Sequence, residues 1–261
     1  MMKSKLLNSL VLTALAVPGV AMAADSLPVT ANVSLTTNYL YRGISQTGGK
    51  PAVQGGFDYA HPSGFYAGVW GSNISWISDV AGTADAASVE LDTYLGFTNS
   101  FATDFSYDVG FLRYNYPGEY TVGTTKADTN EIYGSIGWKW LKLKYSYSLG
   151  DTFGISEAKG TNYVDLSGSY TIEDIGVTVG AHYGKQTYKG ATADGMVLTN
   201  QDPTYSDYNL SASKDFSGYV VGLTFSSTNA ESGGWYTASF QNGSTADLGK
   251  NTVVLSVKRS M

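Results

Sequence analysis

Twelve ionisable side chains share the polar register of the alternating segments in this sequence. Side chains of these types can bind ions or transfer protons. Seven are acids, four are bases and one is a histidine, which gives a formal charge of −3. If the segments enclose a space, such a wall favours cations or neutral solutes over anions. We therefore expect these residues to line a lumen; they are Arg42, Asp58, Glu90, Asp92, Asp108, Glu131, Lys142, Lys144, Asp165, His182, Asp207 and Lys258.

Catalytic motifs are weak. His61 belongs to a turn and His182 lies alone on a polar face, and the chain has no cysteine, no phosphate-binding loop and no nucleophile elbow. A barrel hydrolase that uses His182 with Ser167 or Ser169 and an acid is the enzymatic alternative, but no spacing singles it out. We expect no enzyme, no cofactor and no metal site.

The elements that must position these residues are strands. Apolar and polar residues alternate with a period of two, most clearly where Leu141, Leu143 and Tyr145 interleave with Lys142 and Lys144. About 12 such segments are predicted, and an even number is typical of single-chain bacterial barrels. They span residues 29–42, 53–59, 65–72, 89–97, 105–111, 132–138, 141–149, 164–170, 175–183, 208–214, 219–225 and 253–257.

The connections between the segments alternate in length. Short links at 61–64, 99–104, 139–140, 173–174 and 215–218 separate long links at 43–50, 73–87, 117–129, 150–160, 185–204 and 228–249. Short turns on one side and long loops on the other are typical of outer-membrane barrels. The pattern predicts an all-β fold, a transmembrane antiparallel up-and-down β-barrel.

The register can be assigned from the cost of charge in lipid. Strands in a membrane must close into a barrel, because no water is present to pair their backbone groups. An arginine or lysine facing lipid at mid-bilayer costs about 2 to 4 kcal/mol, so the apolar register must face outward. Aromatic belts are then expected below at Tyr59, Phe97, Phe101, Phe105, Trp138, Trp140, Phe216 and Tyr219, and above at Tyr39, Tyr41, Tyr114, Tyr116 and Tyr147.

The two ends of the sequence point to export and membrane assembly. Lys3 and Lys5, an apolar run and Ala21-Met22-Ala23 predict a signal peptide over residues 1–23, which leaves a barrel domain at 24–261. Val253, Leu255 and Val257 have the spacing read by the barrel-assembly machinery, although the usual final aromatic is replaced by Met261.

Charge and cysteine content narrow the class further. Removing Lys3 and Lys5 from the 16 basic residues leaves 14 against 22 acidic residues, a formal charge of −8, which argues against nucleic acid as a partner. An exported chain without disulfides must be held by its core or by a closed sheet.

Three blocks, NYLYRGISQT, KPAVQGGFDYAHPSGFYAGVWGSN and ELDTYLGF, resemble the TorF-type porins of Gram-negative bacteria. The resemblance extends over the whole mature chain. It implies an outer-membrane location, with membrane lipid and small solutes as partners, and a channel for passive or weakly selective diffusion. The sequence does not specify an oligomeric state.

Two alternatives stay open. One is a closed outer-membrane barrel with a structural or adhesive role and no transport, and the other is a soluble periplasmic barrel or sandwich. Twelve strands lie between 8, which side chains fill, and 16, which leave an open channel, so strand number alone does not choose.

Overall fold

The computed structural model describes residues 28–81, 87–120, 125–189, 203–232, 235–239 and 245–261. The predicted signal peptide and its cleavage site lie outside the described residues. Within them, the only helix is α1 (Trp76–Ala81), and no helix there is long or apolar enough to cross a membrane.

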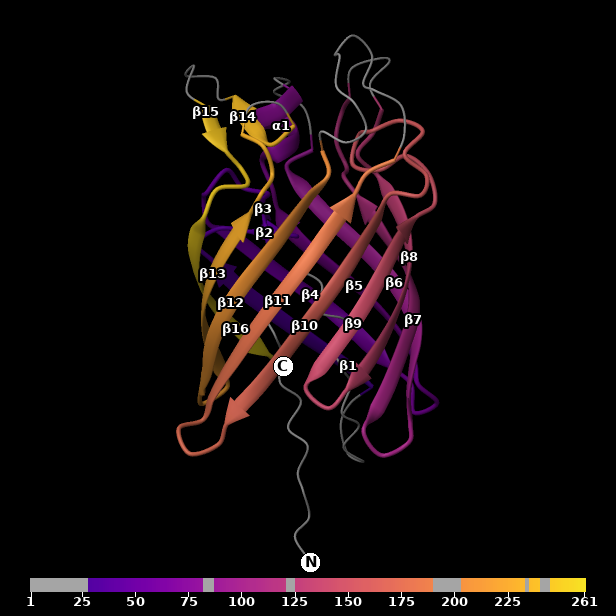
Figure 1. The fold of residues 1–261 in the computed structure, drawn as a ribbon, viewed down its shortest axis with the longest axis vertical. Coiled ribbons are helices and arrows are strands. Elements are labelled where there is room, and N and C mark those ends of the chain that lie inside the picture. Colours follow the sequence, from indigo (N-terminus) through magenta and orange to yellow (C-terminus); the bar gives the residue numbers. More distant parts are fainter. Residues whose placement is uncertain (1–27, 82–86, 121–124, 190–202, 233–234, 240–244) are drawn as a thin grey trace, which may run out of the picture.

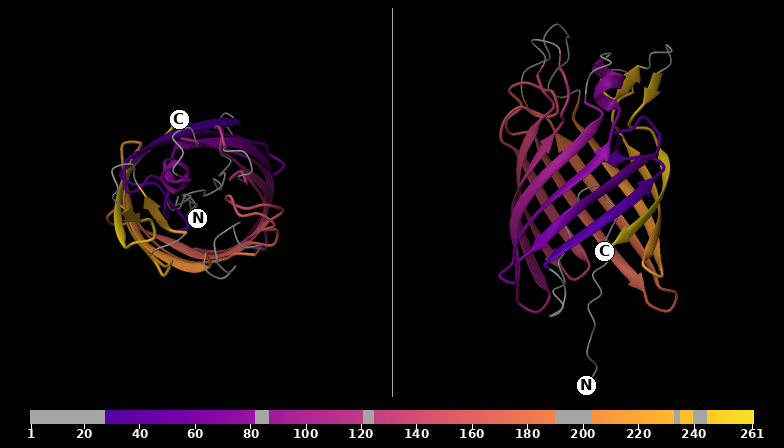
Figure 2. Two further views of the ribbon diagram at one scale, coloured as in Figure 1. Left: turned by 90° about the horizontal axis from the view of Figure 1, so that it is seen from above. Right: turned by 180° about the vertical axis from the view of Figure 1, so that it is seen from behind.

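Twelve antiparallel strands form one closed barrel (Figures 1 and 2), which confirms the predicted fold and strand number. Each strand pairs with the next along the chain, and the last pairs with the first. The strands are β1 (Val29–Thr36), β4 (Ala52–Ala60), β5 (Phe65–Asn73), β6 (Val89–Phe101), β7 (Phe105–Asn115), β8 (Thr129–Trp138), β9 (Leu141–Ser148), β10 (Asn162–Ile172), β11 (Val177–Thr187), β12 (Tyr205–Phe216), β13 (Tyr219–Thr228) and β16 (Thr252–Ser260).

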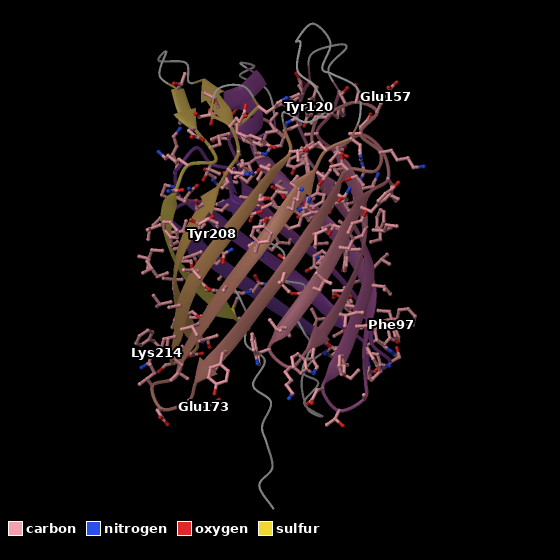
Figure 3. All side chains as sticks on the ribbon, viewed as in Figure 1. Phe97, Tyr120, Glu157, Glu173, Tyr208 and Lys214 are labelled. Carbon is pink, nitrogen blue, oxygen red and sulfur yellow. The ribbon has the colours of Figure 1, made fainter. Side chains whose placement is uncertain are left out.

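The barrel is apolar outside and polar inside, the reverse of a water-soluble protein. Leu35, Phe57 and Leu210 are about 60% exposed on the outer surface, whereas Glu90 and Asp92 are almost fully buried in the interior. The period-two alternation produces this arrangement, because successive residues of a strand point to opposite faces of the sheet. Figure 3 shows the side chains on the barrel in the view of Figure 1.

The two ends of the barrel differ. The tight turns lie at one end, at the bottom of Figure 1, and the long connections lie at the other. The long connections carry α1 and two small sheets, one of β2 (Leu40–Tyr41) with β3 (Ile44–Ser45), the other of β14 (Thr237–Ser239) with β15 (Thr245–Asp247).

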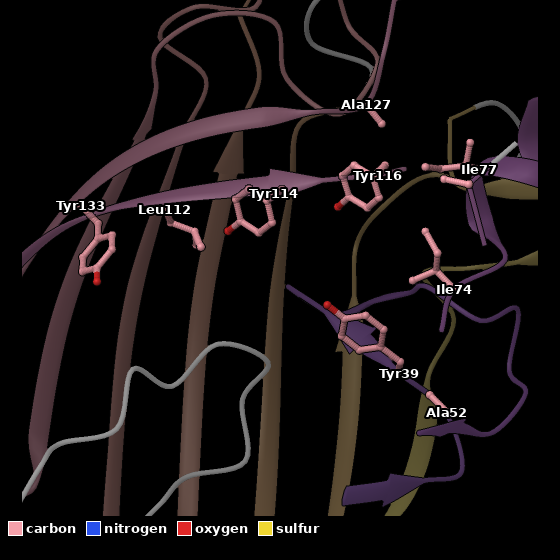
Figure 4. Close-up of a cluster of buried hydrophobic side chains, with 10 residues drawn as sticks. Tyr39, Ala52, Ile74, Ile77, Leu112, Tyr114, Tyr116, Ala127 and Tyr133 are labelled. Atoms are coloured by element: carbon pink, nitrogen blue, oxygen red, sulfur yellow. The ribbon is translucent and has the colours of Figure 1, made fainter. Parts of the chain in front are cut away.

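The first strand is shorter than predicted, and much of the upper aromatic belt is wrong. β1 ends at Thr36, and Tyr39, Tyr114 and Tyr116 are buried in the barrel interior instead of facing outward, while Tyr41 is half-buried against Tyr114. Figure 4 shows this cluster, in which Tyr39, Tyr114 and Tyr116 lie together with aliphatic side chains from the long connections. The lower belt is present: Tyr59, Phe101, Phe105, Trp138, Trp140, Phe216 and Tyr219 are exposed near the short turns.

Candidate functional site

The barrel interior is more open at the short-turn end than at the long-loop end. Inward side chains near the short turns, such as Ser106 and Ser169, are exposed or half-exposed. Inward side chains toward the long loops, such as Thr129, Glu131 and Ser148, are almost completely buried. Residues that do not belong to the barrel wall must therefore occupy the half of the interior next to the long loops.

A hairpin from the first long connection fills much of that half. We call Leu40–Ser45 the crossbar; it consists of β2, the turn Arg42-Gly43, and β3. Both turn residues have positive φ, 46° and 79°, as a tight two-residue hairpin requires. A Cβ atom at Gly43 would lie 2.8 Å from Cβ of Asp207 and 2.5 Å from Cγ2 of Thr228, so only glycine can approach β12 and β13 this closely.

Arg42 at the tip of the crossbar joins it to the opposite wall. Its Nη1 and Nη2 donate to Oε1 and Oε2 of Glu131 on β8, at 3.1 and 2.8 Å. Nη1 also donates to Oε1 of Gln186 on β11 at 2.7 Å, and the guanidinium lies 4.4 Å from the ring centre of Tyr163 on β10. Such a two-pronged pair between buried partners is strong and directional.

The charge of Arg42 is secure despite its burial. Burial lowers the pKa of the guanidinium, but the Glu131 carboxylate beside it raises the pKa, and the net result lies above the usual value. An arginine held in the left-handed region of backbone space is uncommon and costs energy. The contacts to β8, β10 and β11 are what hold it there.

Two tyrosines fasten this part of the chain to the wall: Tyr41 lies in the crossbar, and Tyr39 lies just before it. The Tyr39 hydroxyl donates to Oε1 of Glu90 at 3.1 Å, and the Tyr41 hydroxyl lies 2.7 Å from that of Tyr114. Tyr114 in turn donates to Oε2 of Glu131 at 3.3 Å. Tyr41, Tyr114, Glu131 and Arg42 thus form one hydrogen-bonded chain, and Tyr39 binds a second carboxylate, that of Glu90.

His182 is enclosed by two carboxylates. Its Nδ1 lies 2.5 Å from Oδ2 of Asp165, and its Nε2 lies 2.9 Å from Oδ1 of Asp207. The Ser167 hydroxyl donates to Asp165 at 2.9 Å and not to the imidazole. No hydrogen bond joins His182 to Ser167 or Ser169 in the described part of the chain, so the Ser-His contact that a hydrolase needs is not formed.

The structure places the remaining predicted residues on the inner wall with different partners. Asp58 accepts a hydrogen bond from Tyr94, and Asp108 accepts one from Tyr66. Asp92 is fully buried beside Glu90, and the two carboxyl groups lie within hydrogen-bonding reach of each other. Lys142, Lys144 and Lys258 are half-buried, and none has a carboxylate within 4.0 Å in the described ranges.

Sequence reasoning missed the inward tyrosines. Tyr66 is the cross-strand partner of Gly96, and Tyr94 is the partner of Gly68. The phenol rings lie over these glycines, where a Cβ atom would come within 2.5 Å of the ring or its hydroxyl. A glycine opposite a tyrosine in the polar register was the signal available, since glycine in a strand marks a close approach.

Gly184 on β11 provides a test of this packing. A Cβ atom there would lie 1.9 Å from the Tyr163 hydroxyl and 2.8 Å from Oδ2 of Asp207. We expect Gly184→Ala to lower the free energy of unfolding by about 1 to 3 kcal/mol through overpacking, measured by urea unfolding of the detergent-solubilised barrel. Gly134→Ala is the control, because the nearest neighbour of its Cβ would be 3.9 Å away. Equal stability of the two variants would contradict this account.

The sequence matches, over residues 20–261, the model of a family described as "bacterial protein of unknown function (Gcw_chp)". The chain belongs to the Gcw_chp family. This match does not test the resemblance to TorF-type porins, which stays a prediction. No curated protein matches the sequence.

Several solved porins resemble this Gcw_chp chain in fold. The KdgM porin, solved in complex with disordered oligogalacturonate, has 9% identity and a TM-score of 0.48, over 89% of this chain and 98% of its own. The NanC porin has 9% identity and a TM-score of 0.48, over 88% and 97%. OprD of Pseudomonas aeruginosa has 16% identity and a TM-score of 0.40, over 90% and 66%.

Proposed function

We propose that the protein is an outer-membrane channel for passive or weakly selective diffusion of small solutes. The observation that carries this proposal is a closed barrel whose outer surface is apolar and whose inner wall is polar and charged. An apolar exterior is stable in lipid, and inward polar side chains can replace part of the hydration shell of a solute. The predicted signal peptide supports the location.

The crossbar sets the size of what could pass. It reaches from the first long connection to β8, β10 and β11, and Gly43 packs against β12 and β13. A solute moving along the interior would meet Arg42 and Glu131 where the crossbar spans it, and we propose that this level limits passage. This favours small solutes over large ones.

Two features of the inner wall bear on whether the barrel prefers cations or anions. The formal count of −3 on the inner wall predicts a modest preference for cations. The carboxylates, however, are buried and mostly hydrogen-bonded, as at Glu131 and Asp108, whereas Lys142 and Lys144 have no carboxylate partner among the described residues. The cation preference stays a prediction.

Planar-bilayer recording tests the proposal. We expect the purified protein to form discrete channels, with a reversal potential that shrinks as salt rises to 1 M, because the Debye length then falls to about 3 Å. A potential of the cationic sign would support the formal count, and one of the anionic sign would refute it. Absence of any conductance would overturn the channel proposal.

A closed barrel without transport is the second candidate. The observation that favours it is the burial of the long-loop half of the interior, where Glu131, Thr129 and Ser148 are almost fully covered. Such a barrel would give the same detergent behaviour and the same resistance to unfolding as a channel. The bilayer recording separates the two candidates. Arg42→Ala, which removes the crossbar contact, separates a channel that the crossbar closes from a barrel that is filled throughout.

A further inference from the structure

Lys142 and Lys144 are inward-facing cations two residues apart on β9. Both alternate with outward residues, of which Leu143 and Tyr145 are exposed on the apolar surface. Residues two apart on a strand are separated by about 6.8 Å along it and share a face. The two ammonium groups therefore project from the same wall into the same interior.

Small residues surround this pair, and the surroundings are open at Lys142 but closed at Lys144, where Ser135 and Tyr133 are buried. Lys142 is the cross-strand partner of Gly137 on one side and Ser167 on the other, and Lys144 is the partner of Ser135. Gly137 and Ser167 are half-exposed, which places Lys142 in the more open part of the interior toward the short turns.

The carboxylate nearest to Lys144 in the sheet is already occupied. Asp165 is its direct cross-strand partner on β10, but the two Asp165 oxygens are taken by His182 at 2.5 Å and by Ser167 at 2.9 Å. The Lys144 ammonium instead lies 4.0 Å from the ring centre of Tyr133. A cation over an aromatic face keeps its remaining hydrogen-bond donors available.

The other acids that could neutralise the pair are also engaged elsewhere. Glu131 is held by both prongs of Arg42, and Asp108 accepts a hydrogen bond from Tyr66 at 2.6 Å. The wall thus keeps its negative charges covered and leaves these two positive charges without an ion-pair partner in the part of the chain that the structure describes.

We propose that Lys142 and Lys144 form a binding site for small anions that carry a carboxylate or phosphate group. A lysine ammonium is a compact charge with three donors and binds such oxygens without a fixed geometry. Two of them on one wall can hold one anion between them, below the level of Arg42. The site deepens the proposed channel function by naming a solute class, and in that sense rests on it.

Binding of inorganic phosphate to the detergent-solubilised barrel tests the site without requiring transport. Isothermal titration of the wild type should show one site, and Lys142→Gln/Lys144→Gln should weaken it by about tenfold or more, the effect of losing two ion pairs. Lys185→Gln is the matched control, because Lys185 is an exposed residue on the outward face of β11 and should change nothing. Lys142→Gln alone gives an intermediate loss and serves if the double variant does not fold.

Reversal potentials of the same proteins separate this inference from the channel proposal. If the barrel conducts, the reversal potential of the double variant should indicate a stronger preference for cations than that of the wild type or of Lys185→Gln. Phosphate binding that is absent, or equal in the wild type and double variant, overturns the site even if the barrel conducts. Phosphate binding that the double variant loses, in a barrel that never conducts, supports the site and overturns the channel.

Discussion

Arg42→Ala should raise the conductance of the barrel severalfold and lower its stability in the same variant. The change removes the tip of the crossbar, whose guanidinium spans to Glu131 and Gln186 at 2.7 to 3.1 Å. It also leaves the Glu131 carboxylate, about 1% exposed, without its cation. Breaking a buried pair from one side costs about 3 to 5 kcal/mol. Single-channel recording and urea unfolding in detergent measure the two effects.

Two further variants make this prediction specific. Arg113→Ala removes another arginine-carboxylate pair, but this arginine is on the outward register of β7, 40% exposed, and 3.3 Å from Asp128. We expect it to cost less than about 1 kcal/mol and to leave the conductance unchanged. Arg42→Ala/Glu131→Gln should recover stability and keep the high conductance.

Unchanged conductance in Arg42→Ala would show that the crossbar does not set the narrowest level. The reversal potential of the same variant adds a second reading. If it equals that of the wild type, Arg42 is a structural residue that stiffens the wall; if it shifts, Arg42 contributes to solute selection.

Leu210→Arg should prevent or strongly weaken assembly of the barrel in lipid. Leu210 lies near the middle of β12, points outward and is 58% exposed. An arginine facing the hydrocarbon near the bilayer midplane costs about 2 to 4 kcal/mol. The change should reduce the fraction of protein that folds into lipid vesicles, measured by the mobility difference between heated and unheated samples.

The neighbouring residue supplies the control. Ser211 is next in sequence, half-buried on the inner wall, and has Gly180 and Thr224 as cross-strand partners. Ser211→Arg should fold nearly as well as the wild type, because its charge enters a polar interior. Equal folding of Leu210→Arg and Ser211→Arg would contradict the assignment of the outer face to lipid.

The barrel itself could be predicted from the sequence because the alternation is a local property. Each strand shows its own register, and the cost of a charge in lipid then decides which register faces out, as the exposed Leu143 and the inward Lys144 show on β9. The order of strands follows from the alternation of short and long links. No contact between distant residues was needed.

The crossbar could not be predicted in this way. The alternation of apolar and polar residues continues in the sequence from Thr36 through Tyr39 and Tyr41. In the structure β1 nevertheless ends at Thr36, whose hydroxyl donates to the Asn38 carbonyl at 2.9 Å. The turn that follows holds an arginine in a conformation usually given to asparagine or glycine. Its stability comes from Glu131 and Gln186, and one sequence does not reveal such distant partners.

The pairing of β1 with β16 has a consequence for how fast the protein can fold. Ala31 and Met261 exchange two backbone hydrogen bonds of 2.9 and 2.8 Å, so the seam joins the two ends of the described chain. This contact has nearly the greatest sequence separation available, and such contacts form slowly because the entropy of loop closure must be lost first. Until the seam forms, the sheet has two open edges that can pair with other chains.

The crossbar docks against elements that lie close to that seam. Its Ser45 amide donates to the Leu248 carbonyl at 2.8 Å, just before β16, and Gly43 packs against β12 and β13. Most of the residues that the crossbar packs against are therefore in place only after the strands of the second half of the barrel have formed. We expect closure of the barrel between β1 and β16 to be the slow step of folding, and docking of the crossbar in the interior to follow it. The open sheet, which is prone to aggregation, therefore persists until late in folding.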